Sequence, residues 1–153
     1  MNEVNLYTDG ACSGNPGLGG CACILKYGEN KKVVSAGFTK TTNNRMELMA
    51  AILGLEAMKR KDVKIVVHSD SKYVTDSFNK GWIYNWEKED FNQRTNADLF
   101  IRLLALYRSF QTVTFVWVKG HSGHSENENC DSLAVAMSTN AHINRIEDVG
   151  YKS

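Results

Sequence analysis

The order of the predicted elements indicates an α/β fold, in which a mixed sheet is flanked by helices on both faces. Three strand-like segments come first, followed by a helix, a strand, two or three helices, another strand and a last helix. The chain of 153 residues fits one domain with a sizeable core, which we place at residues 1–140. Residues 141–153 show no periodic pattern and are expected to form a partly disordered tail.

The first three strands are predicted to form an antiparallel meander. Polar and apolar side chains alternate over residues 4–9, as in a half-buried strand. A Gly-Asn-Pro-Gly turn at 14–17 ends this unit. The segments 21–27 and 32–39 then flank a second turn at 28–30, which is the pattern of a hairpin.

The first helix is predicted from its cap and from the spacing of its apolar residues. Thr42 or Asn43 can cap its N-terminus, and Leu48, Ile52 and Leu55 then recur at helical intervals. We expect the helix to end in the basic run that follows, because positive charge suits a helix C-terminus.

The second half of the chain continues the alternation of strands and helices. The expected elements are a buried strand at 65–68, a helix from Ser71, one or two helices over 82–108 with an irregular piece at 92–95, a strand at 113–118, and a last helix opened by the capping-box residues Ser125 and Glu128.

Four carboxylates fall near the ends of these elements, namely Asp9, Glu47, Asp70 and Asp131. Each alone has an ordinary explanation: a turn residue, an acid favoured by a helix dipole, an N-cap or an exposed side chain. Asp9 and Asp70, however, are both predicted at the carboxyl ends of strands, where ligand sites gather in open α/β sheets. Converging acids repel one another unless cations bind between them, and carboxylates suit Mg²⁺. Two such ions can assist displacement at phosphorus.

Four segments of the chain resemble the type 1 ribonuclease H family: residues 7–20, 42–58, 68–74 and 116–134. Their order and spacing cover most of the sequence. The resemblance implies the ribonuclease H-like fold, a five-stranded mixed sheet flanked by helices on both faces. It also implies an endonuclease that hydrolyses the RNA strand of RNA–DNA hybrids and leaves 5′-phosphate and 3′-hydroxyl ends.

The resemblance assigns catalytic and metal-binding roles to the acids Asp9, Glu47, Asp70 and Asp131, which would hold two Mg²⁺ ions, with Mn²⁺ as a substitute. His121 matches a loop histidine of the family that handles protons or aids product release; an imidazole in a glycine-flanked loop suits either task. We assign a structural role to His124. His68 lies on an apolar strand and is expected to be a satisfied core histidine.

Contacts with the hybrid also follow from the resemblance. The residues expected at the 2′-hydroxyls, which distinguish RNA from DNA, are Cys12, Ser13, Gly14 and Asn15. The residues expected at minor-groove base edges are Asn43 and Asn44, and those expected at a phosphate of the DNA strand are Lys40, Thr42 and Asn96. Lys72 stands where many relatives carry an amide. Trp82 falls in the region that contacts the DNA strand, although packing in a helical corner explains it equally well.

One segment departs from the family pattern. Residues 87–94 are acidic on balance, whereas well-known bacterial relatives carry a protrusion rich in Lys and Arg at this point. The net charge of the chain is only +1, and strongly basic domains are the usual nucleic-acid binders. Because phosphate neutralisation supplies much of the affinity for a duplex, we expect weaker hybrid binding or a higher Michaelis constant.

The remaining features predict a cytoplasmic monomer with no membrane contact and no obligate protein partner. The N-terminus lacks the pattern of a signal peptide, and no stretch is apolar enough to span a bilayer. The four cysteines show no zinc-finger spacing and fit free thiols in a reducing compartment.

Three other functions share features with this sequence. A transposase, integrase or junction-resolving nuclease would share the carboxylates but not all four of the segments. A binding module that has lost catalysis would usually lack one of the acids, and all four are present. A nuclease domain detached from a reverse transcriptase fits the fold as well.

Overall fold

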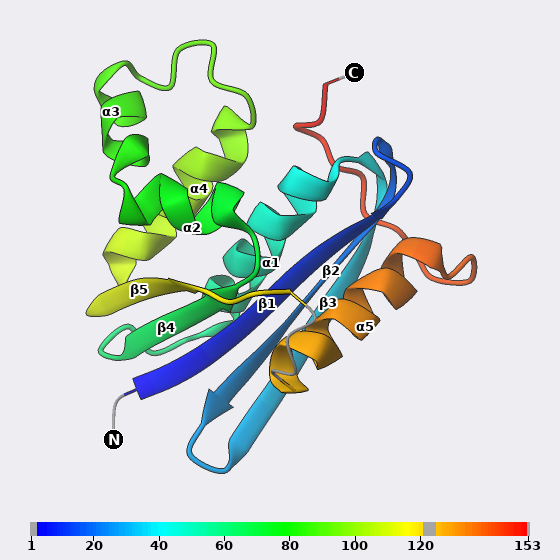
Figure 1. Cartoon of the computed structure of the whole chain (residues 1–153), viewed down its shortest axis with the longest axis horizontal. Helices are drawn as coiled ribbons and strands as arrows, with labels where there is room; N and C mark the ends of the chain where they lie inside the picture. The colour runs from blue at the N-terminus through cyan, green and yellow to red at the C-terminus, as the bar shows by residue number, and fades with distance from the viewer. Residues whose placement is uncertain (1–2, 121–124, 153) are drawn as a thin grey trace.

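The structure, a computed structural model, describes residues 3–120 and 125–152. Its five strands form one sheet in the order β3-β2-β1-β4-β5 (Figure 1). Their bounds are β1 (Glu3–Ser13), β2 (Gly17–Tyr27), β3 (Asn30–Thr41), β4 (Lys64–Ser69) and β5 (Thr112–Trp117). The first three strands pair antiparallel, and β1, β4 and β5 pair parallel, which confirms the predicted five-stranded mixed sheet.

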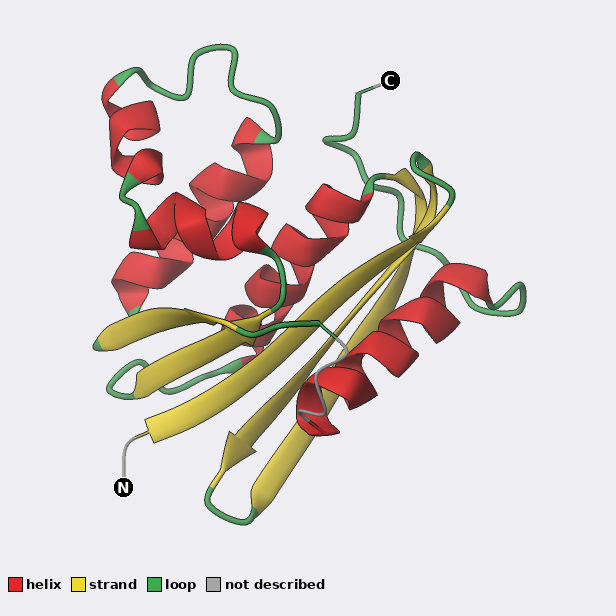
Figure 2. Ribbon diagram, in the orientation of Figure 1, coloured by secondary structure: helices red, strands yellow, loops and turns green. Residues whose placement is uncertain are grey.

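Helices cover both faces of the sheet, as predicted (Figure 2). They are α1 (Asn43–Ala57), α2 (Lys72–Asn79), α3 (Trp82–Lys88), α4 (Ala97–Ser109) and α5 (Ser125–Thr139). Helix α5 lies on one face, over the antiparallel strands, and the other four helices lie on the opposite side. The helices between residues 3 and 120, and between 125 and 152, lack the combination of length and apolar character needed to cross a membrane.

Helix α1 begins as the sequence predicts but ends earlier. The Thr42 side chain accepts a hydrogen bond from the Arg45 N–H (3.3 Å) and caps the N-terminus. At the other end, Met58 adopts an extended conformation and its N–H donates to the Leu55 carbonyl (3.2 Å). The expectation that the basic run 59–61 ends the helix was therefore wrong, because those residues lie beyond its last turn.

Two glycines bring helices into close contact with opposite faces of the sheet. A methyl group at Gly10 of β1 would lie 2.4 Å from the Met46 carbonyl carbon of α1. A methyl group at Gly20 of β2 would lie 2.3 Å from the Ala134 carbonyl oxygen of α5. These separations exclude any side chain, so the glycines set the helix-to-sheet distance. They also bring acidic residues of both helices near β1.

The C-terminal tail follows the edge of the sheet along β3. The Ile146 N–H donates to the Gly37 carbonyl (2.9 Å), and the Ile146 carbonyl accepts from the Thr39 N–H (2.9 Å). The Arg145 guanidinium donates to the Phe38 carbonyl (3.2 Å). These bonds lead the tail toward the N-terminal end of α1 (Figure 1).

Candidate active site

The acidic residues gather where β1 and β4 separate. The strands pair in parallel only as far as Tyr7 and His68, so Asp9 and Asp70 both lie just past the last pair. Asp9 was expected to end its strand, and this was wrong: β1 continues to Ser13, paired with β2 alone. The loss of β4 as a partner, rather than the end of β1, leaves room for a site beside Asp9.

Three carboxylates converge at this point. Asp9, Glu47 and Asp70 each place one oxygen within 4.8 Å of the others. The Gly10 N–H donates to both Asp9 Oδ1 (2.9 Å) and Glu47 Oε1 (2.8 Å), so one backbone amide orients two acids. Asp9 and Glu47 are only 5% and 7% exposed. Such a cluster of buried acids requires positive charge or protons.

The mutual repulsion and burial of these acids shift their pKa values. Burial, the charge of Asp70 and a hydrogen bond with Asp131 raise the pKa of Asp9 to about 8. Burial and then the charges of Asp9 and Asp70 raise the pKa of Glu47 well above its ordinary value. The fourth predicted acid, Asp131 of α5, thus lies beside Asp9. The chain alone does not stabilise the ionised form of this site.

The donor set fits a divalent cation. Among residues 3–120 and 125–152, Asp70 Oδ1 is buried and has no hydrogen-bond partner. The backbone carbonyl of the same residue accepts from Trp117 Nε1 (3.0 Å), which fixes the residue in place. Carboxylate oxygens are the ligands that Mg²⁺ prefers, and a bound cation would satisfy the unpartnered oxygen.

Three histidines were given roles from the sequence. His121 and His124 lie outside the described residues, so their predicted roles remain predictions. The His68 ring stacks on Tyr7 (centroids 4.6 Å apart), and its Nε2 lies 2.9 Å from Asn5 Oδ1. These contacts fit the expectation of a satisfied histidine.

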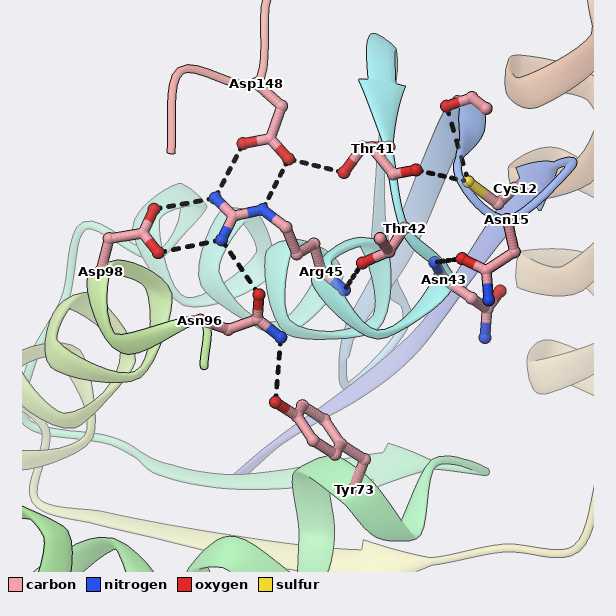
Figure 3. Close-up of polar contacts among 11 residues, drawn as sticks. Cys12, Asn15, Thr41, Thr42, Asn43, Arg45, Tyr73, Asn96, Asp98 and Asp148 are labelled. Atoms are coloured by element: carbon pink, nitrogen blue, oxygen red, sulfur yellow. Dashed lines mark hydrogen bonds and ion pairs between the residues drawn. The ribbon is translucent and has the colours of Figure 1, made fainter. Parts of the chain in front are cut away.

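A groove of about 760 Å³ lies at the N-terminal end of α1. Five of the predicted nucleic-acid contacts line it: Asn15, Thr42, Asn43, Asn44 and Asn96. The Asn15 side chain accepts from the Asn43 N–H (3.1 Å) and ties the turn after β1 to the helix (Figure 3). A second pocket of about 620 Å³ shares Asn44 and Asn96 and includes Trp82, which is 43% exposed.

The other predicted contacts lie outside the two pockets. Ser13 and Gly14 are exposed at the end of β1, where the Cys12 thiol donates to the Thr41 carbonyl (3.4 Å). Lys40 is exposed near the end of β3. Lys72 is exposed beside Asp70, and its Nζ lies 4.6 Å from the centre of the Trp117 ring.

Sequence reasoning missed a buried ion cluster behind the groove (Figure 3). The Arg45 guanidinium, 2% exposed, donates to Asp148 (2.7 and 2.8 Å) and to Asp98 (2.9 and 2.8 Å). It also donates to Asn96 Oδ1 (3.2 Å). Arg45, in the first turn of α1 beside buried apolar residues, was the one available signal, whereas Asp148 lies in a tail without pattern.

Comparisons with known proteins agree with this geometry. Residues 1–139 match the family model described as RNase H. A ribonuclease H of Desulforamulus reducens is 47% identical over 148 residues, which are 94% of this chain and 92% of the relative. One of Escherichia coli O127:H6 is 46% identical over 157 residues, with 99% and 97% covered. The crystal structure of LC9-RNase H1, a type 1 RNase H with the type 2 active-site motif, has a TM-score of 0.81 at 27% identity and covers 90% of this chain and 72% of that chain.

The fold and the carboxylate cluster, taken with these relatives, define a nuclease with a metal-binding site. The chain belongs to the RNase H family, and its resemblance to the type 1 members is confirmed. It is therefore an enzyme of a family that hydrolyses RNA in RNA–DNA hybrids.

Proposed function

We propose that this chain cuts the RNA strand of RNA–DNA hybrids at Asp9, Glu47, Asp70 and Asp131, with the help of two divalent cations, Mg²⁺ or Mn²⁺. The products would carry 5′-phosphate and 3′-hydroxyl ends. The observation that carries the proposal is the set of three carboxylates within 4.8 Å of one another. The unpartnered oxygen of Asp70 lies in the same set.

The four acids would hold the cations. When bound, such cations offset phosphate charge and make water acidic enough to attack phosphorus at neutral pH. The Gly10 N–H donates to one oxygen of Asp9 and to one of Glu47, so the backbone orients both carboxylates. This arrangement is fixed before substrate binds, so little reorganisation is needed.

The groove residues would orient the hybrid. In the proposal, residues 12–15 contact the 2′-hydroxyls, Asn43 and Asn44 reach the minor groove, and Lys40, Thr42 and Asn96 hold a phosphate of the DNA strand. Trp82 and Lys72 would border the substrate, and His121 would handle a proton or aid product release. We also propose that residues 1–140 form the catalytic domain and that the chain acts as a cytoplasmic monomer.

A cleavage assay with three labelled duplexes tests the proposal. In Mg²⁺, we expect the chain to cut the RNA strand of a hybrid in preference to duplexes of RNA alone or of DNA alone. Asp70→Asn should lower hybrid cleavage more than about 100-fold, since losing a ligand should cost at least as much as losing a group that supports one. Asp62→Asn is the matched control, because Asp62 is exposed and pairs with Arg60 instead (3.0 Å).

Two results would overturn the assignment. One is near-native hybrid cleavage by Asp70→Asn, and the other is a preference of the native chain for the DNA duplex. The second result would favour the transposase-like alternative.

A further inference from the structure

The C-terminal tail forms part of the groove that the proposed function assigns to nucleic acid. Gly150, Tyr151 and Lys152 line it together with Thr42 and Asn96. The family model ends at residue 139, so this wall lies outside the matched segment.

A buried ion pair fixes the tail in this position. Asp148 is almost fully buried and accepts two hydrogen bonds from Arg45 and one from the Thr41 hydroxyl (2.5 Å). Burial alone would raise the pKa of Asp148, but the bonds from Arg45 and Thr41 outweigh it and hold that pKa below its usual value. Removing the carboxylate would leave Arg45 buried without one of its two acidic partners.

The route of the tail beyond Asp148 is also constrained. A methyl group at Gly150 would lie 1.8 Å from Asp98 Oδ2 and 2.7 Å from Arg45 Nη2, so the tail passes close over this ion pair and a larger residue would displace its side chains. The Tyr151 N–H donates to the Asp148 carbonyl (3.1 Å) and closes a turn. Lys152 follows this turn directly.

The charges of the groove favour a phosphate. Its positively charged lining residues are Arg94 and Lys152. Its acidic lining residue, Asp98, is paired with Arg45 through two hydrogen bonds. The side of the groove near the tail therefore offers an exposed ammonium group that can contact an anionic strand.

We propose that Lys152 is a further nucleic-acid-binding residue, which contacts a backbone phosphate of the strand in this groove. Asp148 is the positioning residue that places it, through Arg45. The same guanidinium holds Asn96, so the tail and a predicted phosphate contact share one anchor. This inference rests on the proposed function.

The test compares Lys152→Ala with Lys59→Ala, which makes the same charge change on an exposed residue beyond the opposite end of α1. Hybrid binding is measured in EDTA at several salt concentrations, and kcat and KM are measured in Mg²⁺. We expect Lys152→Ala to lower the slope of log affinity against log salt by about 0.9, as for one lost phosphate contact. KM should rise severalfold with kcat unchanged, and Lys152→Arg should restore both values.

The inference is overturned if Lys152→Ala and Lys59→Ala behave alike. Because binding in EDTA needs no cleavage, a native chain that binds but does not cut would contradict the proposed function while still testing Lys152.

A double-mutant cycle tests the role of Asp148. If Asp148 positions Lys152, then Lys152→Ala should change the salt slope little in an Asp148→Ala background. A merely stabilising Asp148 would instead give additive changes, at temperatures where both proteins are folded. Additive changes would show that Asp148 does not position Lys152.

Discussion

Asp9 belongs to the carboxylate cluster, and its ionisation destabilises the folded, metal-free protein. Its pKa is raised to about 8, with burial as the first cause, while an unfolded chain ionises it near pH 4. Between these values the folded state holds a proton that the unfolded state has lost. Stability of the metal-free protein therefore falls as the pH rises from about 4 to about 8.

The change Asp9→Asn should remove this destabilisation. In EDTA at pH 8, we expect the free energy of unfolding to rise by on the order of 2 kcal/mol, with a smaller gain at pH 5. Urea titrations at the two pH values measure the effect. Asp62→Asn should give no gain, because Arg60 lowers the pKa of that exposed acid. An equal or greater gain at pH 5 would contradict the electrostatic explanation.

At the scale of elements, the contact between β1 and α1 positions two of the acids. The methyl group of alanine at position 10 would meet the backbone of Met46 and Glu47 at 2.4 and 2.5 Å. Neither neighbour is a flexible side chain, so α1 itself must move. Glu47 would move with it, and the amide that bridges the two carboxylates would be displaced.

Gly10→Ala should therefore reduce both stability and activity. We expect a loss of about 1–3 kcal/mol in the free energy of unfolding and a marked fall in kcat for hybrid cleavage. The control is Gly28→Ala, at a turn residue with φ of 58° and no atom near the added methyl group. That change should cost about 1 kcal/mol through backbone strain and leave kcat intact. Native kcat in Gly10→Ala would show that the close approach is not required.

The elements also show which features a sequence can predict. The cap at Thr42 is a local pattern, and the structure confirms it. The helix expected from Ser71 is present as well, although it begins at Lys72 with Ser71, and not Asp70, as its N-cap. The extension of β1 to Ser13 is not local, because it depends on pairing with β2 across the sheet. The docking of Asp148 depends on Arg45, 103 residues away, and no periodicity in the tail points to it.

Residues of the site also differ in whether the sequence predicts them. The convergence of Asp9, Glu47 and Asp70 could be predicted because the segments that flank these acids are distinctive. The ion cluster, and the part of the groove that the C-terminal tail lines, could not be predicted. Both arise only when the C-terminus packs against the start of α1. Burial of a charged residue such as Arg45 is a property of the folded chain.

At the scale of the whole molecule, basic residues only just outnumber acidic ones, 18 against 17. The segment 87–94 carries three acidic and two basic residues, and Glu87 pairs with Arg108 (2.6 Å). Arg94, at its end, lies over the Trp86 ring (4.3 Å) and borders both pockets. With a net charge of +1, hybrid binding would depend on a few placed cations and on bound metal. The weak binding expected from the sequence stays a prediction.

In the proposed reaction, water attacks an RNA phosphodiester at the carboxylate cluster. The most direct measurement identifies the termini of the RNA fragments that the native chain releases from a labelled hybrid. We expect 5′-phosphate and 3′-hydroxyl ends, formed in Mg²⁺ or Mn²⁺ and not in EDTA. Fragments that end in a 2′,3′-cyclic phosphate, or cleavage that persists in EDTA, would contradict it, because the neighbouring 2′-hydroxyl or a metal-free site would then perform the reaction.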